Sequence, residues 1–209
     1  MADLTLAMPA KILTLIQELE EEAARQKKLM EEGKGEEIEH PMYACGRETA
    51  LLLYTMVRHA GAKRILELGT SWGYSALWLG AAARYTEGHV DTVERDLDKA
   101  EIATGYFTRA GLSEIISIHL GEAVEMAEKL TGPWDLVFLD VNKDAYVPCA
   151  ELLIPRLRVG GVMVADNMIT HRQMAEIQEF KEFLEKNDTV VTQTIGVGNG
   201  LELTIKLCD

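Results

Sequence analysis

Cysteine is scarce in this sequence, and long apolar runs are absent. The three cysteines, Cys45, Cys149 and Cys208, lack Cys-x-x-Cys spacing, which excludes a disulfide framework and a structural zinc site and favours reduced thiols. No stretch reaches the roughly 18 to 20 consecutive apolar residues of a membrane span. The first residues also lack the basic start and apolar core of a signal peptide. We therefore expect a cytoplasmic protein with no membrane partner.

Positive charge is also in short supply. Lys and Arg total 21 against 34 Asp and Glu, which leaves a net charge of -13. A polyanion would meet a mostly repulsive field, so nucleic acid is disfavoured as a partner. The 209 residues are 47% hydrophobic, an ordinary globular composition that can bury one sizeable core. Without repeats or linkers, we expect a single domain over residues 1–209, with residues 1–46 as an N-terminal helical extension.

Apolar periodicity predicts helices and short strands in alternation. Helical spacing runs from Pro9 to about Gly33 and again from about Arg47 to His59. Short runs that are apolar on both faces predict parallel strands at Arg64–Leu68, Val90–Val93, Ile115–His119, Asp135–Leu139 and Val162–Ala165. After a helix from about Arg172 to Lys186, a closing antiparallel hairpin is expected from Thr189–Ile195 and Leu201–Leu207. The predicted fold class is doubly wound α/β, with a mostly parallel seven-stranded sheet.

The first predicted strand runs into a glycine turn and a helix, with the sequence ELGTSWGYS from residue 67 to residue 75. Gly69 and Gly73 allow a sharp turn, and the helix start offers free N–H groups to an anionic part of a ligand. The Gly-x-x-x-Gly spacing favours a nucleoside-like ligand over a dinucleotide, although glycines that serve only the turn are the alternative. Glu94 ends the second strand, where such folds place an acid on ribose hydroxyls. Glu67 lies inside an apolar strand, which is costly unless hydrogen bonds satisfy it.

Oxygen-bearing side chains end the fourth and fifth predicted strands. Asp140 follows the fourth, and Asp166 and Asn167 follow the fifth. Ligands bind at this edge of doubly wound sheets, and two carboxylates with an amide suit a hard divalent cation. Magnesium is the first expectation, with manganese or calcium as alternatives. Lys143 is placed to act as a base or as a local positive charge. Individually, each of these residues could equally serve a turn or a helix cap.

These motifs together resemble the class I S-adenosylmethionine-dependent, cation-dependent O-methyltransferases of the catechol and caffeoyl-CoA type, in particular the bacterial branch. The resemblance runs from about residue 47 to residue 206, through RILELGTSWGYSALWLG, VDTVERD, DLVFLDVNKDAY, LRVGGVMVADN and GNGLELTIK. It implies a Rossmann-like methyltransferase fold, S-adenosylmethionine as cofactor, and a homodimer.

The resemblance also implies residue roles. It places Glu67, Gly69, Ser71 and Ser75 on the methionine and sugar side of the cofactor, Glu94 on the ribose hydroxyls and Ala123 near adenine. The metal ligands it implies are Asp140, Asp166 and Asn167, and the catalytic residues are Lys143 and Asp140, with Asp140 also beside the cofactor.

The expected reaction is methyl transfer to one hydroxyl of a small vicinal dihydroxy, catechol-like phenol, because chelation and Lys143 together make the nucleophilic phenolate. Where the catechol enzymes carry an acidic residue before the last strand, counting back from Asn199 gives Gln193. His171 either borders the acceptor or belongs to a surface loop. Nothing in residues 1–46 forms a basic pocket for coenzyme A phosphates. The alternatives are a methyltransferase for hydroxyuridine in tRNA and a noncatalytic cofactor-binding protein with the same fold.

Overall fold

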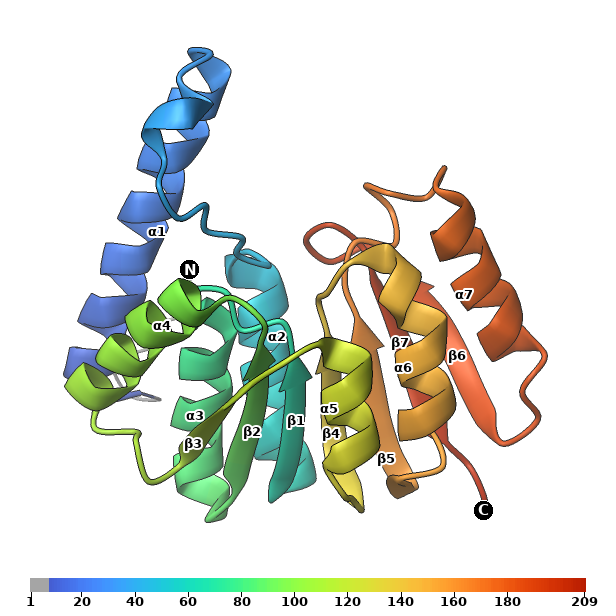
Figure 1. The fold of residues 1–209 in the computed structure, drawn as a ribbon. Coiled ribbons are helices and arrows are strands. Elements are labelled where there is room, and N and C mark those ends of the chain that lie inside the picture. Colours follow the sequence, from blue (N-terminus) through green and yellow to red (C-terminus); the bar gives the residue numbers. More distant parts are fainter. Residues whose placement is uncertain (1–7) are drawn as a thin grey trace.

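The computed structural model describes residues 8–209, and they form one seven-stranded sheet flanked by helices (Figure 1). The strand order is β3-β2-β1-β4-β5-β7-β6. Strands β1 to β5 pair in parallel, and β7 is antiparallel to both of its neighbours. The strands are β1 (Arg64–Leu68), β2 (His89–Glu94), β3 (Ile116–Leu120), β4 (Trp134–Leu139), β5 (Leu157–Ala165), β6 (Val190–Ile195) and β7 (Leu201–Lys206). The doubly wound, mostly parallel sheet with a closing hairpin is confirmed.

Helices cover both faces of the sheet, as the apolar strands require. The helices lie in two groups on the sheet (Figure 1), and one apolar core packs the first four α-helices against it while another packs the last three. The helices are α1 (Ala10–Glu31), α2 (Arg47–Ala60), α3 (Tyr74–Thr86), α4 (Leu97–Ala110), α5 (Ala123–Lys129), α6 (Tyr146–Leu153) and α7 (Ala175–Glu185), with short 3-10 turns η2 (Gly35–Glu37) and η3 (Lys143–Ala145). No helix within residues 8–209 is long and apolar enough to cross a membrane.

The N-terminal helix α1 packs on α3 and α4, and its far end projects beyond the rest of the molecule (Figure 1). Its apolar stripe is almost fully buried against the chain itself, with Ile12 and Ile16 each 1% exposed. A polar contact adds to this packing, because Glu20 accepts hydrogen bonds from Tyr74 Oη at 2.6 Å and from Arg47 at 2.9 Å. The first seven residues of the expected helical extension (1–46) lie outside the residues that the structure describes.

Two elements begin several residues away from their predicted starts, whereas the other strand boundaries differ by at most one residue. Strand β5 begins at Leu157 instead of Val162, because the strand continues through Gly160 and Gly161. A Cβ on Gly161 would press against the Trp134 carbonyl of the neighbouring strand, so glycine permits this close approach. Helix α7 begins at Ala175 instead of Arg172, because residues 171–174 form a turn that the Met174 N–H closes on the His171 carbonyl at 2.9 Å.

Candidate active site

The carboxyl ends of β1, β4 and β5 meet in one place because their following turns are hydrogen-bonded to one another. The Asp140 N–H donates to the Leu68 carbonyl at 2.9 Å, and the Asp166 N–H donates to the Leu139 carbonyl at 3.0 Å. Gly69 adopts a φ of 104°, and a Cβ there would collide with the Asp140 carbonyl oxygen. Only glycine lets the first turn lie this close to Asp140. The cofactor motif and the acidic motif are thereby brought to one cavity.

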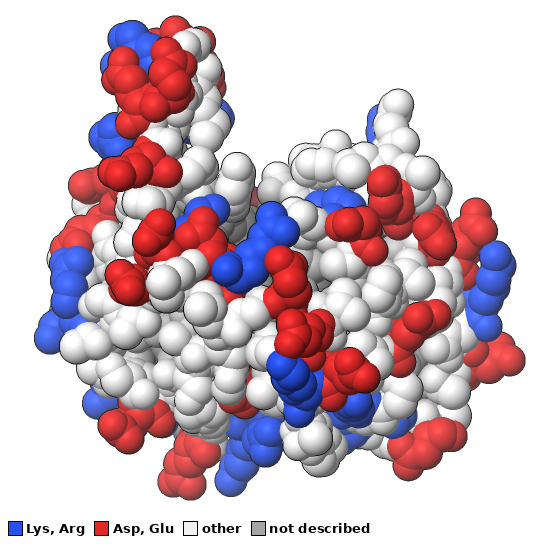
Figure 2. Space-filling model, viewed as in Figure 1, with Lys and Arg blue, Asp and Glu red and all other residues white. Residues whose placement is uncertain are grey.

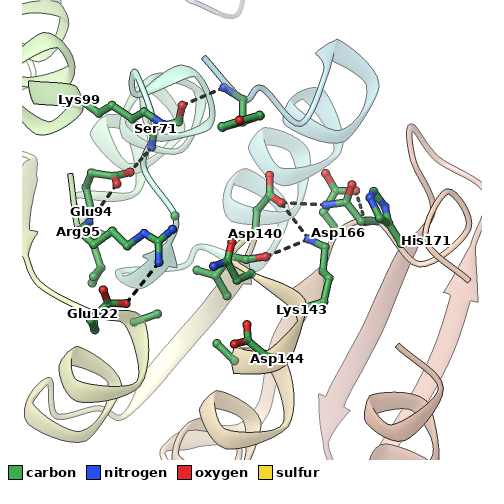
Figure 3. A pocket seen from close by; sticks show the side chains of 18 of the residues that line it. Ser71, Glu94, Arg95, Lys99, Glu122, Asp140, Lys143, Asp144, Asp166 and His171 are labelled. Atoms are coloured by element: carbon green, nitrogen blue, oxygen red, sulfur yellow. Dashed lines mark hydrogen bonds and ion pairs between the residues drawn. The ribbon is translucent and has the colours of Figure 1, made fainter. Parts of the chain in front are cut away.

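Glu94 is held at this edge by backbone donors from two loops (Figure 3). Its Oε2 accepts the Ser71 N–H at 2.7 Å, and its Oε1 accepts the N–H groups of Arg95 and Asp96 at 3.0 Å. Ser71 adopts the left-handed backbone conformation, with a φ of 48°, which is uncommon for a residue with a Cβ. A carboxylate has about four lone-pair sites, so Glu94 retains capacity to bind sugar hydroxyls.

Glu67 lies fully buried beneath the glycine turn. The Thr92 hydroxyl donates to its Oε2, whereas its Oε1 has no hydrogen-bond partner among residues 8–209. Burial raises the pKa of Glu67 to about 7, and hydrogen bonds from Ser75 and Thr92 oppose that rise. The carboxyl is therefore only partly satisfied, as a group that awaits a polar or cationic ligand would be.

The predicted metal ligands lie together. Asn167 Nδ2 donates to Asp140 Oδ1 at 2.9 Å, and the Asn167 N–H donates to Asp166 Oδ1 at 2.7 Å. Asp166 Oδ2 is buried without a hydrogen-bond partner among the described residues. Burial and the nearby Asp140 carboxylate raise the pKa of Asp166 to about 7, and burial also raises the pKa of Asp140. This is the electrostatic signature of two carboxylates that lack a positive partner of sufficient charge.

Within residues 8–209, no three His, Cys, Asp or Glu side chains are grouped as metal ligands would be. A cation at this site would therefore take two carboxylates, the Asn167 carbonyl oxygen after a flip of that amide, and further oxygens from water or acceptor. The orphaned Asp166 Oδ2 and this all-oxygen donor set fit a hard divalent cation.

Lys143 projects from η3 into the same cluster (Figure 3). Its Nζ donates to Tyr146 Oη at 2.8 Å and to the Val141 carbonyl at 3.0 Å, and it lies 3.7 Å from Asp140 Oδ1. Tyr146 is fully buried, and its hydroxyl donates in turn to the Asp166 carbonyl at 3.1 Å. Burial lowers the pKa of Lys143, so its ammonium gives up a proton more readily than a surface lysine does.

A cavity of about 1100 Å³ contains most of the predicted site. The predicted residues that line it are Gly69, Ser71, Glu94, Ala123, Asp140, Lys143, Asp166 and Asn167. Glu67 and Ser75 are buried and are not among the residues that line the cavity, so their cofactor contact stays a prediction. Gln193 is exposed on β6 and does not line the cavity, whereas Asn199 and His171 do. Gln193 therefore does not face the cavity, which is bordered by the hairpin turn and not by the strand before it.

Sequence reasoning missed several side chains that shape the site. Tyr146 holds Lys143, and its spacing of three residues along the chain would have placed both on one side of a helical turn. Gln26 occupies a position in the apolar stripe of α1 and is 2% exposed. A polar residue at a core position of a helix is the signal that could have found it. Tyr43 and Lys99 also line the cavity and lie outside every motif quoted above, and Arg95 lines it within VDTVERD without having been assigned a role.

Comparison with known proteins yields a consistent set of relatives. A family model described as O-methyltransferase matches residues 20–207. The chain is 32% identical over 184 residues to a catechol O-methyltransferase of Niastella koreensis, covering 79% of this chain and 83% of that protein. It is 27% identical over 184 residues to a caffeoyl-CoA O-methyltransferase of Populus kitakamiensis, covering 78% and 76%. The crystal structure of the O-methyltransferase TomG from Streptomyces achromogenes, in complex with SAM, matches with a TM-score of 0.75 and 26% identity, covering 98% of this chain and 94% of that one.

Proposed function

The chain belongs to the O-methyltransferase family, and from that premise we propose that it methylates one hydroxyl of a small vicinal dihydroxy, catechol-like acceptor with the help of a divalent cation. Transfer of a methyl group from S-adenosylmethionine to oxygen is the activity of the family. We propose, beyond this family activity, the class of acceptor, the use of a divalent cation and the roles of individual residues.

The observation that carries the proposal is the buried Asp166 Oδ2, which has no hydrogen-bond partner within residues 8–209 and lies beside the half-buried carboxylate of Asp140. We propose that Asp140, Asp166 and Asn167 hold the cation, with magnesium as the first candidate and manganese or calcium as alternatives. A divalent cation supplies Lewis-acid chemistry here, which lowers the pKa of a phenol from its usual value near 10.

The chain's own residues then position the reactants and move the proton. Lys143, held on Tyr146 Oη and the Val141 carbonyl, is proposed to receive the acceptor's hydroxyl proton at Nζ. Glu94 and Ser71 are proposed to fix the ribose of the cofactor, so that the methyl group faces the acceptor oxygen. Because the sulfonium methyl is already activated, this alignment of oxygen, carbon and sulfur is the protein's main contribution.

A small acceptor is favoured over tRNA by charge. Figure 2 shows acidic side chains spread over this face and gathered at the projecting end of α1 and η2, where Glu31, Glu32 and Glu36 are exposed. With the net charge of -13, this surface would repel a phosphate backbone. We propose a phenolic small molecule as the partner, and neither nucleic acid nor membrane.

We also propose that residues 1–209 form a single methyltransferase domain with a helical extension at 1–46, that it is cytoplasmic, and that it forms a homodimer. The three cysteines are free thiols, in keeping with a reducing compartment. The support for a dimer comes from the exposed apolar residues Val191 and Ile205 on the terminal hairpin.

Methyl transfer from labelled S-adenosylmethionine tests the function. The purified protein is offered a panel of vicinal diphenols, monophenols and bulk tRNA, with and without a chelator. We expect label in the diphenols only, and loss of that label in excess chelator. Label in tRNA alone would replace the proposed acceptor by the RNA alternative. Cofactor binding without label in any acceptor would favour the noncatalytic reading.

A further inference from the structure

Residues 38–46, which we name the strap, connect η2 to α2 (Figure 1), and Met42, Tyr43 and Ala44 of the strap line the cavity. Residues 41–46 have no regular secondary structure, yet Ile38 and Met42 are each only 7% exposed. Met42 and Tyr43 both line the cavity, as does Ala23 of α1. Buried side chains thus anchor this irregular segment, although the Tyr43 side chain itself is 65% exposed.

Two side chains hold the strap's backbone. The Met42 N–H donates to Gln26 Oε1 of α1 at 2.8 Å. The next residue, Tyr43, donates its N–H to Ser71 Oγ of the glycine turn at 3.0 Å. Lys99 Nζ lies 4.8 Å from the centre of the Tyr43 ring, a cation–π contact from α4. The strap is therefore hydrogen-bonded to α1 through Met42 and to the glycine turn through Tyr43.

The same serine links the strap to Glu94. While Ser71 Oγ accepts from Tyr43, the Ser71 N–H donates to Glu94 Oε2 at 2.7 Å (Figure 3). Ser71 also adopts an uncommon backbone conformation, with a φ of 48°, so its position depends on these contacts. A shift of the strap would break the Tyr43–Ser71 hydrogen bond and leave Ser71 held by its bond to Glu94 without that support.

Gln26 is itself fixed before it holds Met42. Its Nε2 donates to Glu22 Oε1 at 2.8 Å, and Arg25 holds the same Glu22 carboxylate with Nε at 2.7 Å. Because the amide group is oriented by Glu22, its oxygen faces Met42 without further loss of side-chain freedom. The buried Gln26 amide bonds through both its nitrogen and its oxygen, so it fixes the position of the Met42 backbone. An apolar residue at the same helix position would not.

We propose that Gln26 is a positioning residue for cofactor binding. It acts through the strap and Ser71 to hold the glycine turn in the geometry that binds the cofactor. The inference rests on the placement of S-adenosylmethionine at Ser71 and Glu94. It is independent of the proposed acceptor and cation. It gives α1 a role in the site beyond packing, since the helix fixes a segment that forms part of the cavity wall.

The test is Gln26→Met, which keeps side-chain length and helix propensity but removes both hydrogen bonds. Gln17→Met is the matched control, because Gln17 is exposed on the same helix and its side chain donates to Glu21 in the next turn, away from the strap. Calorimetric titration with S-adenosylmethionine should show an affinity loss of about 5- to 10-fold in Gln26→Met, the effect of one lost buried hydrogen bond, and none in Gln17→Met. With a reactive acceptor, KM for the cofactor should rise while kcat at saturation stays unchanged.

A double-mutant cycle with Ser71→Ala tests the route, and the two affinity losses should be clearly less than additive. A Gln26→Met protein that unfolds at lower temperature but binds the cofactor normally would overturn the proposal, because its role would then be structural only. An equal loss in Gln17→Met, or full additivity in the cycle, would overturn it as well.

Discussion

At the scale of single residues, the site is defined by buried charge. Asp166 is 0% exposed, and burial together with Asp140 raises its pKa to about 7. Buried carboxylates persist when they are paired with positive charge or a metal ion. A buried carboxylate at Asp166 with one oxygen that lacks a hydrogen-bond partner among the described residues does not stabilise the fold, so binding of a ligand is the better explanation for its presence.

Asp166→Asn is the sharpest test of the proposed cation site, because it keeps an oxygen for the Asn167 N–H and removes only the charge. We expect turnover to fall by about 10²-fold or more, the order that loss of Lewis-acid assistance implies, with cofactor affinity within a few-fold of normal. Chelator treatment of the unaltered enzyme should have the same effect, and magnesium or manganese should restore the rate. Asp188→Asn, on an exposed carboxylate, serves as the control. Full activity of Asp166→Asn would reduce the cluster to turn-forming residues.

Glu67 leads to a prediction about stability. Its pKa is raised in the folded state, from 4.5 to about 7, so the folded protein binds a proton that the unfolded chain releases. The protonated carboxyl therefore contributes stability that is complete below pH 4.5 and is lost as the pH rises to about 7. The cofactor-free protein should lose at most about 3 kcal/mol of its unfolding free energy through this group.

Glu67→Gln should abolish that dependence, because a neutral amide does not titrate. Urea unfolding of both proteins across this pH range gives the difference between them, in which the contribution of Asp166 largely cancels. We expect Glu67→Gln to gain stability relative to the unaltered protein as the pH rises. A difference that is flat with pH would show that Glu67 has an ordinary pKa.

At the scale of elements, the turn after β1 is the least replaceable part of the fold. Gly69 combines a positive φ with a contact that leaves no room for a Cβ against the Asp140 carbonyl. Gly69→Ala should destabilise the protein by about 2 kcal/mol or more and weaken cofactor binding, since backbone strain and displacement of Asp140 act together. Gly105→Ala is the control, because a Cβ there meets open space within α4. Thermal unfolding and calorimetry measure both effects, and a Gly69→Ala protein equal to the control would contradict the steric argument.

The elements also show what a sequence can and cannot predict. Strand β1 was predicted residue for residue, because Arg64–Leu68 is apolar on both faces and bounded by Lys63 and a glycine. Asp140, Asp166 and Asn167 were predicted as a cluster because parallel strands end at a common edge. Gln26 and Tyr43 were not predicted, because their partners lie 16 and 28 residues away along the chain and no local pattern records such contacts. That Gln193 does not line the cavity could not be predicted either, since counting along a hairpin does not reveal which part of it faces the cavity.

At the scale of the whole molecule, the predicted homodimer requires an exposed apolar surface for its interface. The family resemblance implies a homodimer, and the apolar residues of the first helix and of the hairpin are the two candidate surfaces in the sequence. The structure removes the first, because the apolar stripe of α1 is buried within the chain, with Leu19 0% exposed. The hairpin remains, since Val191 and Ile205 are paired across β6 and β7 and are 50% and 41% exposed.

The dimer prediction therefore concentrates on this pair. β6 is the last strand of the sheet, and an exposed apolar edge of this kind is either covered by a partner or a liability for aggregation. Light scattering at micromolar concentration should give twice the chain mass of 23.2 kDa. Lys substitution at both Val191 and Ile205 should return the mass to that of one chain, because burying two unpaired ammonium groups on each side of the interface costs more free energy than the interface supplies.

Met30→Lys is the control for this prediction. Met30 is 47% exposed at the projecting end of α1, so this substitution should leave the dimer intact. A single-chain mass for the unaltered protein would contradict the homodimer, and a dimer that survives both Lys substitutions would move the interface away from the hairpin.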